Sequence, residues 1–148
     1  GLALLESGRI AVSVIGDGDY LMGATALWTA ARYRIPTLIV VVNNRAFYND
    51  EVHQERVALE RNRPTQNKSI GQRIGDPDID LAGLARAQGA VGIGPVGDPS
   101  GLDKALSEAV AATASGNPVV VDVLVTPGFE ASAARALLRK PAAGARPA

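Results

Sequence analysis

Apolar and polar positions follow one another along this chain in an order that predicts an α/β fold. Three short runs are almost continuously apolar and rich in β-branched residues, as strands are when both faces of a parallel sheet are covered, and a fourth run is a short strand despite its two glycines. These predicted strands are residues 9–15, 37–42, 91–96 and 119–125. Between them, apolar residues recur every three or four positions, which is the spacing of one helical face. The predicted helices are residues 19–33, 49–61, 78–88 and 99–115.

Buried strands that alternate with helices predict a three-layer α/β/α arrangement around a parallel sheet. Asp78 is the expected N-cap of the third helix, and Trp28 shares the apolar face of the first, so we expect it in the core or an interface. Residues 62–76 have few apolar side chains. We expect a mobile connection there, and both a lid over a pocket and a plain surface loop fit it.

The two ends of the chain depart from this pattern. Residues 2–7 resemble the last turns of a helix that Gly8 ends, and the chain starts without Met. We therefore expect a fragment that is truncated at its N-terminus. Residues 129–148 are rich in Ala and Arg, and we expect a flexible tail with a short helix over 131–139. The predicted division is a folded domain, residues 1–128, followed by this tail.

Composition and charge exclude several classes of function. The 15 basic and 15 acidic side chains cancel, and Lys and Arg are not clustered as nucleic-acid binding requires. The apolar runs are shorter than the roughly 20 residues that span a bilayer. The chain has no Cys, which excludes disulfides, thiolate metal ligands and cysteine nucleophiles. We expect a cytoplasmic protein that binds neither nucleic acid nor a membrane.

Polar residues follow the first two predicted strands at the point where each strand ends. Gly16-Asp17-Gly18-Asp19 closes the first strand and Asn43-Asn44 closes the second. The carboxyl ends of parallel strands share one edge of a sheet, where ligands gather. Carboxylate and amide oxygens suit Mg²⁺ or Ca²⁺ better than zinc. The two glycines let the backbone approach an anion, and the following helix start points its amides at it. The pattern predicts a pocket for a divalent cation and a diphosphate.

Gly16-Asp17-Gly18, followed after 24 residues by Asn43-Asn44, resembles the metal and diphosphate signature of thiamine-diphosphate-dependent enzymes. Residues 77–90 are similar to the helix that follows the cofactor loop in that family. Residues 106–109 and 118–123 are similar to its closing helix and strand. The resemblance covers about residues 1–128. It is to acetolactate synthase and benzoylformate decarboxylase relatives in particular, and it implies a thiamine-diphosphate-binding fold.

The resemblance implies a role for each residue at these motifs. Asp17 and the side-chain oxygen of Asn44 would bind Mg²⁺, and the backbone carbonyl of Ala46 would be the third ligand. The amides of Gly18 and Asp19 would donate to the diphosphate. The implied cofactor-binding residues are Gly16, Asp17, Gly18, Asp19, Asn44, Ala46, Phe47 and Tyr48. Many relatives have Gly at the position of Tyr48. No catalytic residue is assigned.

The same resemblance implies an activity for the intact protein. Family members are lyases or transferases that decarboxylate 2-oxo acids, with or without ligation of the product to a second carbonyl compound. Their activating glutamate lies on a pyrimidine-binding domain, which would belong to the same full-length chain or to another subunit. The family implies a homo-oligomer, either a dimer or a tetramer. We expect the 148 residues alone to be inactive or nearly so.

Two other functions fit the residues. One is a non-catalytic nucleotide- or phosphate-binding α/β module, although the chain lacks a third glycine at the dinucleotide spacing and a Gly-Lys-Ser/Thr loop. The other is a structural subunit that completes a partner's site. His53, the only histidine, lies in a strongly charged helical stretch. We favour a solvent-exposed position for it over an acid–base role, and a place at the edge of the pocket stays open.

Overall fold

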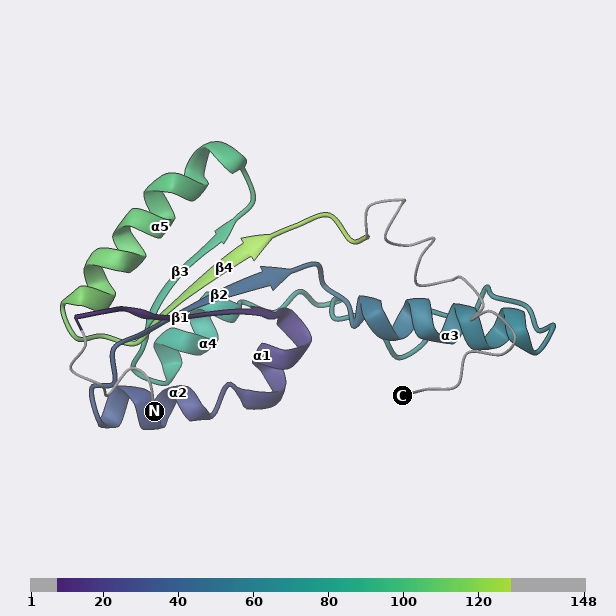
Figure 1. The fold of residues 1–148 in the computed structure, drawn as a ribbon, viewed down its shortest axis with the longest axis horizontal. Helices are drawn as coiled ribbons and strands as arrows, with labels where there is room; N and C mark the ends of the chain where they lie inside the picture. Colours follow the sequence, from purple (N-terminus) through teal and green to yellow (C-terminus); the bar gives the residue numbers. More distant parts are fainter. Residues whose placement is uncertain (1–7, 129–148) are drawn as a thin grey trace. The chain divides into compact units, whose positions relative to one another are not determined.

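The computed structural model describes residues 8–128, and the chain divides into two compact units (Figure 1). Among the described residues, the first unit comprises 8–46 and 74–126, and the second comprises 47–73 with 127–128. The helices predicted over residues 2–7 and 131–139, and the flexible tail, lie outside the described residues. The division into a domain and a tail therefore stays a prediction.

The first unit is built on a four-stranded parallel sheet. Its strands are β1 (Ala11–Gly16), β2 (Thr37–Asn43), β3 (Val91–Val96) and β4 (Val119–Leu124). They lie in the order β1-β2-β4-β3, and every neighbouring pair is parallel. Each strand coincides with a predicted apolar run to within two residues at either end. The prediction of a parallel α/β fold is confirmed.

Helices cover both faces of this sheet, as Figure 1 shows. One face packs against α1 (Asp17–Gly23), α2 (Ala26–Arg32) and α4 (Leu81–Ala87), and the other packs against α5 (Pro99–Ala114). The chain crosses from β1 to β2 in one direction along the sheet and from β3 to β4 in the opposite direction. Right-handed crossovers then require the two sets of connecting helices to lie on opposite faces. The result is the predicted three-layer arrangement.

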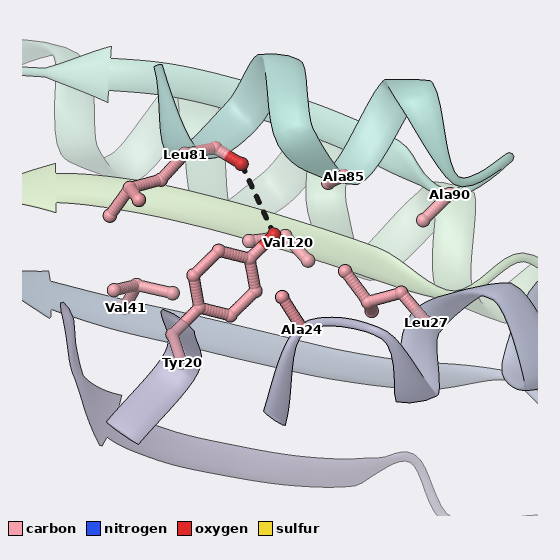
Figure 2. Packing of buried hydrophobic residues seen from close by; sticks show 8 residues of the cluster. All are labelled: Tyr20, Ala24, Leu27, Val41, Leu81, Ala85, Ala90 and Val120. Carbon is pink, nitrogen blue, oxygen red and sulfur yellow. Dashed lines mark hydrogen bonds between the residues drawn. The ribbon is translucent and has the colours of Figure 1, made fainter. Parts of the chain in front are cut away.

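Two apolar clusters fill the spaces between these layers. Figure 2 shows the first, in which the Tyr20 hydroxyl donates to the Leu81 carbonyl at 3.1 Å and so links α1 to α4. Its buried members are Tyr20, Ala24, Leu27, Val41, Leu81, Ala85, Ala90 and Val120. The second cluster lies under α5 and consists of Leu38, Ala105, Ala109, Val119 and Val121. Burial of these side chains from water stabilises the stacked layers.

The first predicted helix differs from the structure. It begins two residues earlier, at Asp17, and divides into α1 and α2 after Gly23, a residue that weakens helices. Trp28 is 59% exposed, so it is not part of the core of the described chain. Leu27 takes the buried position instead. Because neighbouring helical residues point about 100° apart, burying one of this pair directs the other outward.

Two further predictions need correction. The N-cap of α4 is Asp80, whose side chain accepts from the Gly83 amide at 2.6 Å, and Asp78 instead pairs with Arg45 at 3.0 Å. β1 is not buried on both faces, because Val12 and Val14 are 56% and 66% exposed. These two valines share the sheet face of α5, which packs on β2, β3 and β4.

The second unit contains α3 (Tyr48–Glu60), which confirms the helix predicted over residues 49–61. The chain then runs through turns as far as residue 73, with no helix or strand among residues 61–72. Whether this connection moves stays a prediction. Within residues 8–128, no helix combines the length and apolar character needed to cross a membrane.

Candidate functional site

The junction of β1 and α1 buries Asp17 at the carboxyl edge of the sheet. Gly16 keeps the extended backbone of the strand, and Asp17 is the first residue of the helix. The Asp17 side chain is only 2% exposed. Its Oδ1 accepts from the Gly18 amide at 3.1 Å and its Oδ2 accepts from the Ala46 amide at 3.1 Å. Among residues 8–128 it forms no ion pair with a Lys or Arg side chain.

The loop after β2 brings Asn44 to the same place. Asn44 Oδ1 accepts from the Ala46 amide at 3.0 Å, and this amide also donates to Asp17. Arg45, which lies between Asn44 and Ala46 in the sequence, has a φ of 57°. This left-handed conformation reverses the direction of the backbone. The structure therefore brings together the three residues that the sequence predicts as metal ligands. Within residues 8–128, no backbone amide donates a hydrogen bond to the carbonyl of Ala46.

A second pair of buried polar side chains, Asn43 and Asp122, supports the loop that follows β2. Asn43 Nδ2 donates to Asp122 Oδ1 at 2.9 Å, and Asn43 Oδ1 accepts from the Arg45 amide at 3.1 Å. Asp122 lies opposite Val41 in the β2–β4 register, which puts it diagonal to Asn43. No role is predicted for Asp122 from the sequence pattern. A signal was present, because an acid inside an otherwise apolar buried strand needs a polar partner.

Burial dominates the electrostatics of these acids. It raises the pKa of Asp17, and the amide hydrogen bonds from Gly18 and Ala46 oppose the shift. It also raises the pKa of Asp122, with the Asn43 hydrogen bond opposing and the charges of Asp80 and Asp17 adding. Ionisation of Asp17 and Asp122 therefore costs free energy in the folded chain. A bound cation would offset that cost directly.

The remaining predicted residues are distributed over both units. The Gly18 amide is already directed at Asp17, so binding a diphosphate through it requires exchange of that hydrogen bond. The Asp19 side chain is exposed. Phe47 and Tyr48 belong to the second unit, where Phe47 precedes α3 and Tyr48 begins it. Within residues 8–128, no three His, Cys, Asp or Glu side chains gather as a metal-binding group. The predicted site thus has one carboxylate ligand.

A parallel sheet with polar side chains at the carboxyl ends of two adjacent strands belongs to the class of open α/β domains, in which ligands bind at this edge. A family model described as "Thiamine pyrophosphate enzyme, C-terminal TPP binding domain" matches residues 1–123. The chain therefore belongs to this family of thiamine pyrophosphate-binding domains. The resemblance to thiamine-diphosphate-dependent enzymes is confirmed.

Individual relatives agree with this assignment. The chain is 33% identical over 114 residues to the acetolactate synthase isozyme 3 large subunit of Escherichia coli K12, covering 77% of this chain and 18% of that protein. It is 38% identical over 47 residues to benzoylformate decarboxylase of Pseudomonas aeruginosa PAO1, covering 32% of this chain and 9% of that protein.

A solved structure is also similar, the thiamine diphosphate-dependent 4-hydroxybenzoylformate decarboxylase of Rhodococcus jostii RHA1. The TM-score is 0.62 at 27% identity, over 86% of this chain and 21% of that chain. The chain thus spans about a fifth or less of the length of each of these three proteins.

Proposed function

We propose that this domain holds the magnesium–diphosphate end of thiamine diphosphate. One observation carries the proposal. The buried Asp17 carboxylate shares the Ala46 amide with Asn44 Oδ1 and has no cationic side chain beside it in residues 8–128. Mg²⁺ is commonly bound by one or two carboxylates or carbonyls together with phosphate oxygens. Asp17, the Asn44 side chain and the Ala46 carbonyl would supply the protein oxygens.

The other predicted residues take supporting roles in this proposal. Gly16 and Gly18 leave room for the diphosphate, and the amides of Gly18 and Asp19 donate to it. Phe47 and Tyr48 would lie along the cofactor. When bound, thiamine diphosphate supplies the carbanion chemistry that breaks the bond beside a 2-oxo group. The residues of this chain bind and orient the cofactor, and they compensate the charge of its metal.

In the intact protein we propose a lyase or transferase that decarboxylates a 2-oxo acid, with or without ligation to a second carbonyl compound. The pyrimidine end of the cofactor would be held by a further domain of the same full-length chain or by another subunit, in a homo-oligomer. Support comes from the similar acetolactate synthase and benzoylformate decarboxylases. We place the protein in the cytoplasm and expect these 148 residues alone to be inactive.

Ligand selectivity tests this function against a general nucleotide- or phosphate-binding module. Isothermal titration of the chain with thiamine diphosphate, ATP and NAD, each with and without Mg²⁺, compares the three ligands. We expect binding of thiamine diphosphate that requires Mg²⁺ and exceeds that of ATP and NAD. Equal affinity for all three ligands, or the same affinity for thiamine diphosphate with and without Mg²⁺, would favour the general nucleotide- or phosphate-binding module. Turnover of a 2-oxo acid only after mixing with a separate pyrimidine-domain chain would identify a subunit that completes a partner's site.

A further inference from the structure

The charged side chains of residues 47–73 fall into two groups. Three ion pairs form within this segment: Glu51 with Arg73 at 2.9 Å, Glu55 with Lys68 at 2.7 Å, and Arg56 with Glu60 at 3.1 Å. Asp50, Arg61 and Arg63 remain, and they have no ion-pair partner in the part of the chain that the structure describes. This remainder is more basic than acidic.

All three of these side chains line one hollow in the second unit. The hollow has a volume of about 510 Å³, within the range of roughly 300–1,000 Å³ typical of small-molecule sites. Asp50 lies in the first turn of α3 and Arg61 directly follows its last residue, so the two are about 16 Å apart along the helix axis at 1.5 Å per residue. Between them the lining includes Val57, and Pro64 adds a second apolar surface beside Arg63. The hollow therefore has a basic end, an apolar part and an acidic end.

A hydrogen-bonded backbone turn carries the two arginines of the basic end. α3 ends at Glu60 with Arg61 as its C-cap, and the next residue, Asn62, has a left-handed φ of 52°. The Asn62 amide donates to the Leu59 carbonyl at 3.2 Å and the Arg63 amide donates to the Ala58 carbonyl at 2.8 Å. This pair of hydrogen bonds is a Schellman motif, which satisfies the carbonyls at the end of the helix. Arg61 and Arg63 thus flank one fixed turn.

We propose that this hollow is a binding site for a small molecule that carries an oxyanion, either a carboxylate or a phosphate. Arg61 and Arg63 bind the oxyanion, because guanidinium groups donate charge-assisted hydrogen bonds to carboxylate and phosphate oxygens. The apolar part of the ligand packs on Val57 and Pro64. Asp50 repels an anion at the opposite end, so the ligand has one orientation. The site uses none of the residues proposed to hold the metal or the diphosphate.

Three aromatic probes of similar size test this site on the full chain. Phenyl phosphate and benzoate carry the two kinds of oxyanion, and benzyl alcohol is a neutral control. Titrations at constant ionic strength, followed by backbone amide NMR, report both affinity and location. We expect at least one anion to shift the amide signals of residues 61–63 and to bind at least about tenfold more tightly than benzyl alcohol. The preferred anion identifies the source of the oxyanion, phosphate or carboxylate.

Arg61→Gln/Arg63→Gln is the test variant, and Arg32→Gln/Arg34→Gln is its matched control. Arg32 and Arg34 are also exposed, two residues apart, at the end of a helix and without an ion pair in residues 8–128, but they do not line the hollow. We expect the test variant to lose at least about tenfold in affinity and the control to lose none. Equal losses in both variants, unshifted signals at residues 61–63, or equal binding of benzyl alcohol would overturn the proposal.

A third variant separates this site from the proposed cofactor site. Asp17→Asn removes the proposed metal ligand and should leave binding of the anionic probes unchanged. Loss of probe binding in Asp17→Asn would show that the probes occupy the site at Asp17, and it would overturn the assignment to the hollow. Failure of thiamine diphosphate to bind the wild-type chain would count against the proposed function alone.

Discussion

Asp17 in the first unit and Glu51 in the second are both buried acids, yet their surroundings differ. Glu51 is 1% exposed and faces Arg73, which donates through Nη2 to Oε2 at 3.0 Å and holds Nε 2.9 Å from Oε1 without hydrogen-bond alignment. Asp17 is 2% exposed and accepts only backbone amides. A buried charge normally needs a partner. Glu51 has its cation within the chain, whereas Asp17 has no Lys or Arg side chain paired with it in residues 8–128.

Asp122 extends the comparison, because it too is buried and accepts from an amide group, that of Asn43, with no cation paired to it among the described residues. The first unit therefore concentrates negative charge around the carboxyl edge of its sheet. The second unit pairs most of its charges internally. Four variants and their controls test this difference.

The largest expected effect is a loss of folding stability at alkaline pH, which depends on Tyr20. Burial, together with the nearby Asp122 charge, raises the pKa of the Tyr20 hydroxyl to about 12 from an ordinary value of 10.0. The unfolded chain then loses this proton first, so stability falls as the pH rises from 10 to 12. The two-unit shift corresponds to about 3 kcal/mol. Urea unfolding at a series of alkaline pH values measures the loss. Tyr20→Phe should remove most of this slope, and an unchanged slope would contradict the assignment.

Arg73→Gln removes the cation that is paired with the buried Glu51. It leaves Glu51 buried without a cation, which costs about 3–5 kcal/mol in fully buried pairs. Arg73 is about half exposed, so water screens the pair and we expect about 2 kcal/mol. Urea denaturation of the second unit measures this change. Glu51→Gln/Arg73→Gln should recover part of the loss. A change below about 0.5 kcal/mol in the single variant would show that Glu51 needs no partner.

Asn43→Ala tests the support behind the metal loop. It removes the link between Asp122 and the Arg45 amide, so the loop that carries Asn44 and Ala46 loses its fixed position. Removing such supporting groups weakens metal affinity by about 10- to 100-fold. We expect at least about tenfold weaker Mg²⁺ binding in the presence of thiamine diphosphate. Asn67→Ala, an exposed position in the second unit, is the control. Equal affinities in both variants would exclude a positioning role for Asn43.

Asp17→Asn should have the smallest effect, on the pH dependence of stability without metal. The raised pKa means that the folded wild-type chain takes up a proton more readily than the unfolded chain. Its stability therefore rises as the pH falls from neutral through that raised pKa. The Asn variant lacks this gain, although Asp122 still contributes. Urea midpoints in EDTA at pH 7 and 5 measure the difference. A larger gain in the variant would contradict the direction of the shift.

The sequence was sufficient to predict the layers and the edge at which Asp17 and Asn44 meet. Apolar runs that alternate with helices predict parallel strands, and parallel strands place their carboxyl ends together. The partner of Asp122 was beyond sequence reasoning, because Asn43 lies 79 residues away and only the strand order makes them neighbours. Apolar periodicity also could not show that α5 leaves Val12 and Val14 uncovered. It identifies apolar faces, but not the elements that cover them.

The central claim is that the Asp17 carboxylate holds a divalent cation together with the diphosphate. Isothermal titration of Mg²⁺ into the chain with thiamine diphosphate, for wild type, Asp17→Asn and the exposed control Asp103→Asn, tests it most directly. We expect Asp17→Asn to lose more than about tenfold in Mg²⁺ affinity and Asp103→Asn to match wild type. Equal Mg²⁺ affinity in all three proteins would contradict it.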